Sequence, residues 1–441
     1  MRLPILVGVL TSTLPAFADT PPPPVRTIVK AARVFDGTGD RWRPNTALLV
    51  EGAVIKAVGT PADLAKQAPG ATVIDLGDVT LLPGLVDAHT HVMVSPPLAG
   101  DDDYAQHLIK QSIAARAIAA TANARRMLMY GFTALRDVES EGAMYADVDV
   151  AQAIERGIVV GPRMQVSTRG LAPTHGYLPD DIAWDVEIPS GAQLVDGVDE
   201  IRKAIREQVK HGATWIKVYA DFGGYESTRA DRRFRSRTNF TVDEMTALVA
   251  EAHRLGRRVA AHATGWDGID QALRAGVDSI EHGLGLTDDL AQRMVTQGVS
   301  LVPTITAFRE GTKTAPDAVK RRIADAQRAS LKVALARGVR IANGSDVGSF
   351  SFEINPVSDL EALVELGATP PVALRAATSI AGALFDPQCA PDQKECLRGR
   401  VGRIAVDSFA DLIAVEGDPT TDIKALRKLR FVMANGVVQK R

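Results

Sequence analysis

The feature that most constrains the fold is an alternation of helical segments and short apolar strands in the middle of the chain. Four long segments carry apolar residues at three- and four-residue spacing, as amphipathic helices do: 105–130, 198–211, 241–255 and 318–337. The short apolar runs that predict strands are 84–91, 133–137, 163–167, 214–219, 258–262, 279–282, 300–304 and 340–343. Eight strands with helical connections predict an α/β fold, a (β/α)8 TIM-type barrel, with a doubly wound open sheet as the alternative.

Both ends of the chain predict β structure instead. The segments rich in β-branched residues and broken by glycine turns are 27–39, 47–59, 401–419 and 431–440. The Asn435-Gly436 pair is a hairpin signal. Neither end has enough strands to bury a core alone, so we expect the two ends to combine into one small β-sandwich domain. The predicted domains are the β-sandwich parts 19–82 and 398–441 and the metal-dependent barrel 83–397.

The first 18 residues predict a signal peptide. Arg2 precedes an apolar stretch, and the triplet Ala16-Phe17-Ala18 fits a small-x-small cleavage site. The apolar stretch is shorter than the ~20 residues that a membrane span needs; an uncleaved anchor is the alternative. We therefore expect cleavage near Ala18, a periplasmic or secreted protein, and no stable membrane span in the mature chain.

Charge and cysteine content limit the partners. The chain has 51 Lys and Arg against 53 Asp and Glu, which argues against nucleic acid, because phosphate binding needs a basic face. Its two cysteines, Cys389 and Cys396, predict a small disulfide in an oxidising compartment, with free thiols or a metal clip as alternatives. Oligomeric state is not decided by the sequence, and a homo-oligomer stays open.

Chemically active side chains stand at the ends of several predicted strands. They are His89, His91, Lys217, His262, His282 and Asp346. In such barrels the chemistry lies at the carboxyl ends of the strands. Because side chains alternate along a strand, His89 and His91 face the same side. We therefore expect the whole set to point toward one mouth of the barrel.

Taken singly, each of these residues has a simpler explanation. A histidine after an apolar strand can be a hydrogen-bonded rim residue, Asp346 can cap a helix, and Lys217 can extend its charge to solvent. Taken together, four imidazoles and a carboxylate inside a barrel would be costly unless something compensates them. The set therefore predicts a metal site, and its nitrogen and oxygen ligands suit Zn²⁺ or a similar first-row ion.

The other histidines carry weaker predictions. His175 lies in the turn-rich loop "LAPTHGYLP" after the third strand, where it either binds substrate or is an ordinary loop residue. His107, His211 and His253 lie in helical segments, and we expect them at the surface.

The motifs "PGLVDAHTH", "HATG", "EHG" and "GSD", in this order and with a strand lysine between the first two, resemble the amidohydrolase superfamily. The resemblance covers nearly the whole mature chain and includes the superfamily's split β-sandwich. The segments "GFTALRDV", "HGATWIKVYA" and "SIEHGLGL" are similar to its prolidase-like branch, with Xaa-Pro dipeptidases, carboxypeptidases that release a C-terminal residue, and ochratoxin amidases.

The resemblance implies a centre of two divalent metal ions, with zinc as the default and manganese or cobalt as alternatives. His89 and His91 would hold the more buried ion, and His262 and His282 the second. Lys217, carboxylated by CO2, would bridge both ions. A carbamate is an anionic ligand, whereas an ammonium group would repel two cations.

The resemblance also implies hydrolysis of an amide bond in a small-molecule or peptide-like substrate, such as a dipeptide, an N-acyl amino acid or an ochratoxin-like amide. Asp346 would bind the first ion and shuttle the proton, as a base and then an acid. Tyr219, two residues beyond Lys217 on the same strand face, is a candidate for oxyanion stabilisation or substrate contact. His175 is the second candidate.

One loop departs from the prolidase-like pattern. It reads "ADFGG" after the lysine strand and is then basic, from Arg229 to Arg237, which suits either a solvated loop or a lid that binds a substrate carboxylate. Two further functions stay open: a cyclic-amide hydrolase or lactonase with the same centre, and a non-catalytic binding scaffold.

Overall fold

The computed structural model describes residues 25–94, 101–177, 179, 182–222, 233–385 and 400–441. The predicted signal peptide, Cys389 and Cys396, and Arg229 and Arg232 of the basic loop lie outside the described residues. Within the described part of the chain, no helix is long and apolar enough to cross a bilayer.

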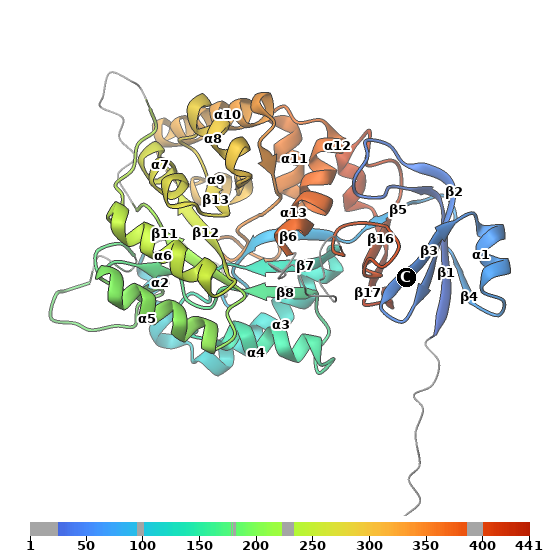
Figure 1. Ribbon diagram of the computed structural model, residues 1–441, viewed down its shortest axis with the longest axis horizontal. Coiled ribbons are helices and arrows are strands. Elements are labelled where there is room, and N and C mark those ends of the chain that lie inside the picture. Colours follow the sequence, from blue (N-terminus) through green and yellow to red (C-terminus); the bar gives the residue numbers. More distant parts are fainter. Residues whose placement is uncertain (1–24, 95–100, 178, 180–181, 223–232, 386–399) are drawn as a thin grey trace, which may run out of the picture.

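The two ends of the chain share one eight-stranded sheet. Its strands are β1 (Arg26–Val34), β2 (Arg43–Glu51), β3 (Val54–Gly59), β4 (Thr72–Asp75), β5 (Thr80–Pro83), β16 (Leu412–Val415), β17 (Leu429–Ala434) and β18 (Val437–Lys440). The order is β18-β17-β16-β5-β1-β2-β3, with β4 paired to β1. The ends meet where β5 pairs antiparallel with β16, seen as blue beside red in Figure 1. Asn435 and Gly436 form the predicted hairpin turn between β17 and β18.

Alternating side chains give this sheet two apolar faces. Ile28 and Leu49 pack on one face against Leu64 of helix α1 (Pro61–Gln67). Val29 and Leu48 point to the other face, into a cluster that includes residues of β16 and β17. This period of two is what a strand requires when both of its faces are covered.

The middle of the chain contains the eight predicted strands. They are β6 (Leu85–Thr90), β7 (Phe132–Asp137), β8 (Arg163–Val166), β11 (Trp215–Tyr219), β12 (Arg258–Ala263), β13 (Ser279–His282), β14 (Ser300–Val302) and β15 (Arg340–Ile341). Two further two-residue strands, β9 (Leu171–Ala172) and β10 (Gln193–Leu194), were not predicted. All pairings among these strands are parallel, in the orders β6-β7-β8 and β10-β9-β11-β12-β13-β14-β15.

Backbone hydrogen bonds join the edges of these two parallel sheets. The amide of Ala88 in β6 donates to the carbonyl of Asn343, just beyond β15, at 2.9 Å. The amide of Thr214, just before β11, donates to the carbonyl of Val166 in β8 at 2.8 Å. The chain therefore continues the hydrogen bonding from one sheet to the other on both sides.

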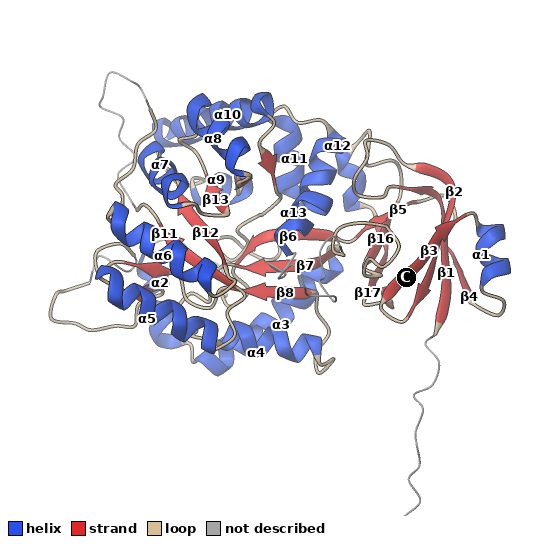
Figure 2. Cartoon of the chain, in the orientation of Figure 1, coloured by secondary structure: helices blue, strands red, loops and turns tan. Residues whose placement is uncertain are grey.

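Helices cover the outside of the parallel strands (Figure 2). They are α2 (Asp101–Lys110), α3 (Ile113–Met129), α4 (Ala146–Glu155), α5 (Gly197–Lys210), α6 (Val242–Arg254), α7 (Trp266–Ala275), α8 (Asp288–Gln297), α9 (Ile305–Gly311), α10 (Asp317–Arg337), α11 (Val357–Glu365), α12 (Pro370–Arg375) and α13 (Ala381–Phe385). A π-helical turn, η1 (Ala376–Ile380), and a 3₁₀ turn, η2 (Ile423–Arg427), complete the set.

Two helical predictions need correction. The segment 105–130 is two helices, because Ser112 caps α3: its hydroxyl accepts the amide of Ala115 at 3.2 Å. His107 is not at the surface: it is 3% exposed on α2, and its ring stacks on Tyr104. His211 is exposed, and His253 pairs with Asp278 at 2.8 Å.

Candidate metal centre

One cavity of about 320 Å³ gathers the predicted metal ligands. His89, His91, Lys217, His262, His282 and Asp346 all line it. They come from the ends of β6, β11, β12 and β13 and from the segment after β15. Parallel pairing brings these ends together: Tyr219 lies opposite His262, and Ala263 opposite His282. Residues separated by more than 250 positions therefore share one site.

The imidazoles and the carboxylate lie within ligand distance of one another. Asp346 Oδ1 lies 3.2 Å from His91 Nε2 and 3.8 Å from His89 Nε2. One ligand atom each from His89, His282 and Asp346 falls within 4.8 Å of the others. The rings of His262 and His282 have centroids 4.5 Å apart. A single small cation can therefore contact several of these atoms.

Partner groups fix the orientation of His89. Its Nδ1 lies 2.7 Å from Glu281 Oε2, and the other oxygen of Glu281 accepts Arg136 Nη2 at 2.8 Å. Ser279 also donates to this carboxylate, at 2.5 Å. These buried groups hold the proton of His89 on Nδ1 and leave Nε2 free, the arrangement that orients a metal-binding histidine.

Two further histidines are oriented in the same way. His282 Nδ1 lies 2.8 Å from Thr304 Oγ1, and His91 Nδ1 lies 3.2 Å from the carbonyl oxygen of Glu139. His282 Nε2 remains available to the cavity, whereas His91 Nε2 faces Asp346 Oδ1 at 3.2 Å. His262 differs, because its Nε2 approaches Thr264 Oγ1 at 3.1 Å and leaves Nδ1 available.

Burial sets the protonation of the imidazoles. It lowers the pKa of His89 and of His282 well below 6.5, and that of His262 to about 3, so these rings are neutral, the form that binds metals. Burial also opposes the charge on His91, but its hydrogen bond to Asp346 raises the pKa of His91 to about 9. A metal ion at this position would compete with the proton for His91 Nε2 and Asp346 Oδ1.

Lys217 is buried in the cavity wall at 1% exposure. Burial lowers its pKa from 10.5, although nearby carboxylates, led by Glu281, act in the opposite direction. Among the described residues, no carboxylate forms a salt bridge with Lys217. A neutral amine is the form that reacts with CO2, so the residue suits the predicted carbamate. A divalent-metal centre suits this set of three neutral imidazoles, one carboxylate and this lysine.

The loop after β15 brings Asp346 close to the two histidines of β6. Asp346 has a left-handed backbone with φ 62°, an uncommon conformation that tends to occur at functional sites. A Cβ at Gly344 would lie 2.8 Å from the Cβ of His89, and one at Gly348 would lie 2.7 Å from that of His91. Only glycine permits this approach.

Tyr219 and His175, the two predicted substrate contacts, occupy different places. Tyr219 lines the cavity, and its hydroxyl donates to Glu139. His175 is exposed and is not among the residues that line the cavity. Tyr177, two residues further along the same loop, does line it.

The predictions from the sequence missed an acidic and aromatic group at this cavity, in which Glu141 lines the wall and Glu139 is buried behind it. Glu139 and Glu141 follow β7 directly, in the stretch "VESEG", and three tyrosines surround them. The available signal was the position of these acids after the second strand, the same kind of signal that identified the histidines. Glu281 was also missed, although it precedes His282 in "SIEHG".

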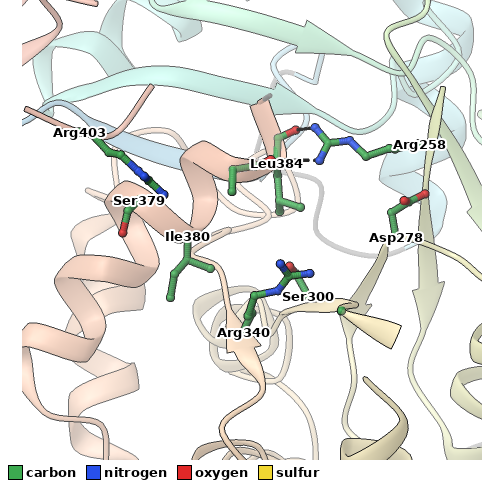
Figure 3. Close-up of a pocket in the computed structure, with 10 residues that line it drawn as sticks. Arg258, Asp278, Ser300, Arg340, Ser379, Ile380, Leu384 and Arg403 are labelled. Atoms are coloured by element: carbon green, nitrogen blue, oxygen red, sulfur yellow. Dashed lines mark hydrogen bonds between the residues drawn. The ribbon is translucent and has the colours of Figure 1, made fainter. Parts of the chain in front are cut away.

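A second cavity, of about 260 Å³, lies at the opposite ends of β12, β14 and β15 (Figure 3). It is lined by three arginines, Arg258, Arg340 and Arg403, and also by Asp278, Ser300 and Ser379. Arg258 donates to the backbone carbonyls of Ala383 and Leu384. None of the predicted site residues lines this cavity.

Comparison with known proteins gives a consistent result. The model of the Amidohydrolase family matches residues 80–439. Ochratoxinase from Aspergillus niger is 31% identical over 438 residues, which cover 92% of this chain and 84% of that protein.

Two solved structures are similar over almost the whole chain. The structure of a Xaa-Pro dipeptidase with bound methionine in the active site matches with a TM-score of 0.79 and 28% identity, over 94% of this chain and 100% of that one. A prolidase complexed with N-methylphosphonate-L-proline matches with a TM-score of 0.79 and 29% identity, over 95% and 100%. The chain therefore belongs to the amidohydrolase family and is a hydrolase that acts on C–N bonds.

Proposed function

We propose that the protein is a metal-dependent hydrolase of a dipeptide-like amide with a free carboxylate. The observation that carries the proposal is the set of four oriented imidazoles, one buried lysine and one carboxylate around a single cavity. Ochratoxinase and the dipeptidases to which the chain is similar support an amide substrate. The ligands in the two solved structures, methionine and an L-proline derivative, support a carboxylate next to the scissile bond.

The metal ligands would be the six residues predicted from the sequence. The contacts of His91 and His89 with Asp346 support one ion at these residues, and the proximity of His262 and His282 supports a second. Lys217, as a carbamate, would lie between them. When bound, such ions lower the pKa of water and polarise the carbonyl of the substrate.

Asp346 is the residue that would move the proton. Its side chain is 13% exposed, so it reaches the cavity, and its Oδ1 lies beside His91. In the proposed reaction, Asp346 accepts a proton from the attacking water and later donates it to the leaving nitrogen, as general base and then general acid. The rigid loop around Gly344 and Gly348 keeps this carboxylate in place.

Tyr219 would contribute to substrate binding. Its buried ring forms part of the cavity wall, and its hydroxyl lies 3.2 Å from that of Tyr177. Replacing Tyr219 by Phe should reduce kcat/KM, because the hydroxyl would no longer be available to Glu139 or to substrate. His175→Ala provides the comparison: its exposed position favours a smaller loss, and unchanged kinetics would remove it as a substrate contact.

We also infer that the parallel strands form the predicted (β/α)8 barrel, with the site at its carboxyl-terminal mouth. The hydrogen bonds from β6 to the segment after β15, and from β8 to the start of β11, support closure. Active sites of such barrels lie at that end of the strands.

The test is a metal-reconstituted activity screen with dipeptides and N-acyl amino acids that differ in the leaving residue. We expect Asp346→Asn to fold and to lose turnover by at least ~10²-fold, as general acid–base catalysis contributes. Asp243→Asn, an exposed residue in the first turn of α6, is the matched control and should behave as the wild type. Full activity of Asp346→Asn, or turnover of lactones alone, would contradict the proposal.

A further inference from the structure

One wall of the catalytic cavity is acidic and aromatic. Glu141 lines this wall, and the fully buried Glu139 lies behind it. Tyr104, Tyr177 and Tyr219 donate to the two carboxylates. The proposed reaction uses neither glutamate. The function of this wall is therefore not explained by the metal ligands.

Each of the three tyrosine hydroxyls donates to one of the two glutamates. Tyr104 and Tyr177 both donate to Glu141 Oε2, Tyr177 at 2.6 Å. Tyr219 donates to Glu139, whose other oxygen accepts the amide of Gly170 at 3.0 Å. The tyrosines thus supply donors to the acids and hold them firmly in position.

The rings also form an open aromatic corner. Tyr177 lies with its centroid 4.4 Å from that of Tyr219, 6.2 Å from that of Tyr104 and 6.3 Å from that of Phe222. All four rings, together with Glu141, line the cavity. Aromatic faces beside a carboxylate are the usual surroundings of a bound ammonium group.

Few of the described residues that line the cavity carry a permanent positive charge that could pair with Glu141. Lys217 is the one lysine or arginine among the described residues that line the cavity, and the proposed function converts it to a carbamate. Arg116 approaches from behind, but its guanidinium donates to the backbone carbonyls of Met93, Ser140 and Glu141. Glu141 therefore has no arginine partner in the described cavity lining, and an ammonium group of the substrate can contact it.

The position of Glu141 indicates which cation fits. Its Oε1 lies 3.5 Å from Nδ1 of His91, a proposed metal ligand. A cation bound here is therefore close to the scissile carbonyl. In a dipeptide, the α-ammonium nitrogen is two bonds away from the carbon of that carbonyl. The backbone fixes this position: Glu141 has φ 50°, and Gly142 after it has φ 81°.

We propose that Glu141, with the rings of Tyr104, Tyr177 and Tyr219, binds the free α-ammonium group of the substrate. The preferred substrates are then unblocked dipeptides rather than N-acyl amino acids. This inference rests on the proposed amide hydrolysis and narrows its substrate class. Glu141 is a specificity residue, and it does not take part in the bond-breaking step.

The experiment compares a dipeptide with its N-acetyl derivative, with the same leaving residue, on the metal-reconstituted enzyme. We expect the wild type to prefer the free amine by ~10-fold or more in kcat/KM, the size of one favourable charge contact. Glu141→Gln should lose most of this preference, because kcat/KM should fall more for the dipeptide than for the N-acetyl substrate. Glu155→Gln, at an exposed position on α4, is the control.

The outcomes separate the two proposals. If the wild type hydrolyses neither substrate, the proposed function fails. If it hydrolyses both equally well, or prefers the N-acetyl form, only the ammonium site is overturned. If Glu141→Gln lowers both activities to the same extent at unchanged metal content, Glu141 only positions His91, and the inference is again overturned. If Glu141→Gln loses metal, the inference is judged on the wild type alone: it stands if the wild type prefers the dipeptide to its N-acetyl derivative, and it is overturned if the wild type does not.

Discussion

At the scale of single residues, the proposed metal ligands depend on the side chains behind them. Glu281 joins His89 to Arg136 in a fully buried group. Arg136 in turn donates to the carbonyl of Ala88 at 2.6 Å, and its guanidinium packs over Trp215. The orientation of one ligand is thereby tied to the core of the strands.

Glu281→Gln tests this connection. The variant keeps the shape of the side chain but removes the charge that pairs with Arg136, so a buried guanidinium loses its partner at a cost of ~3–5 kcal/mol. It also weakens the acceptor of His89. We expect metal affinity to fall ~10–100-fold, measured by competition with a chelator, and the melting temperature to fall.

Its control is Glu365→Gln, which removes the exposed partner of Arg309. Surface pairs contribute only ~0–1 kcal/mol, so this variant should retain both metal affinity and stability. Equal metal affinity of Glu281→Gln and the wild type would show that the buried carboxylate does not orient His89.

At the scale of elements, the loop after β15 determines where Asp346 lies. Gly344 is the tightest point of this loop: a Cβ there would be 2.3 Å from Val302 Cγ1 and 2.8 Å from the Cβ of His89. The backbone of the loop therefore rests directly on β14 and β6.

We expect Gly344→Ala to move the loop away from β6. Overpacking of this kind costs ~1–3 kcal/mol, so the melting temperature should decrease, and the metal content after dialysis should decrease with it. Gly311→Ala, where the added Cβ meets nothing within 4 Å, is the control. Normal metal content in Gly344→Ala would mean that the loop tolerates displacement.

The packing of α9 against α11 predicts a pH dependence of stability. Asp359 on α11 is 2% exposed, and burial raises its pKa to about 7 despite the hydrogen bond from the amide of Thr306 at 2.8 Å. The folded state thus binds this proton more tightly than the unfolded state. The contribution of this proton to the free energy of unfolding is complete below pH 3.8, the ordinary pKa of the group. That contribution is lost as the pH rises to about 7.

Asp359→Asn removes this titration. The melting temperature of the variant minus that of the wild type should therefore increase between about pH 4 and pH 7 and level off above pH 7. Thermal unfolding at a series of pH values measures the difference. A constant difference over this range would show that Asp359 does not carry the effect.

At the scale of elements, the sequence predicted the strands of the parallel region. All eight strands of the parallel region appear at the expected segments, because continuous apolar runs between helices have few alternatives. The break at Ser112 was missed, since the apolar spacing of α2 and α3 continues across it and only the cap reveals the boundary. His107 was misplaced because periodicity alone does not show which face of α2 packs against Tyr104.

At the scale of the whole molecule, two long-range arrangements shape the fold, and the first of them creates the site. The parallel strands bring His89 and Asp346 together, and β5 joins β16 so that both ends of the chain close one sheet. The strand-end residues were predictable because their position follows from the order of strands. Glu139 and Glu141 also follow a strand directly, so their position was available from the sequence and was overlooked. The pairing of Glu281 with His89 was not predictable, because a pairing across strands depends on side-chain direction and register, which a single sequence does not show.

The central claim is that the six strand-end residues form a two-metal centre. The most direct measurement is the number of metal ions per chain, by elemental analysis of protein reconstituted with Zn²⁺ in bicarbonate buffer. The account predicts about two ions per chain for the wild type, as two-metal hydrolytic sites hold. It predicts fewer ions for His262→Ala and for Lys217→Ala, with amide hydrolysis lost in parallel. A wild-type protein that hydrolyses dipeptides fully while holding no metal ions would contradict it.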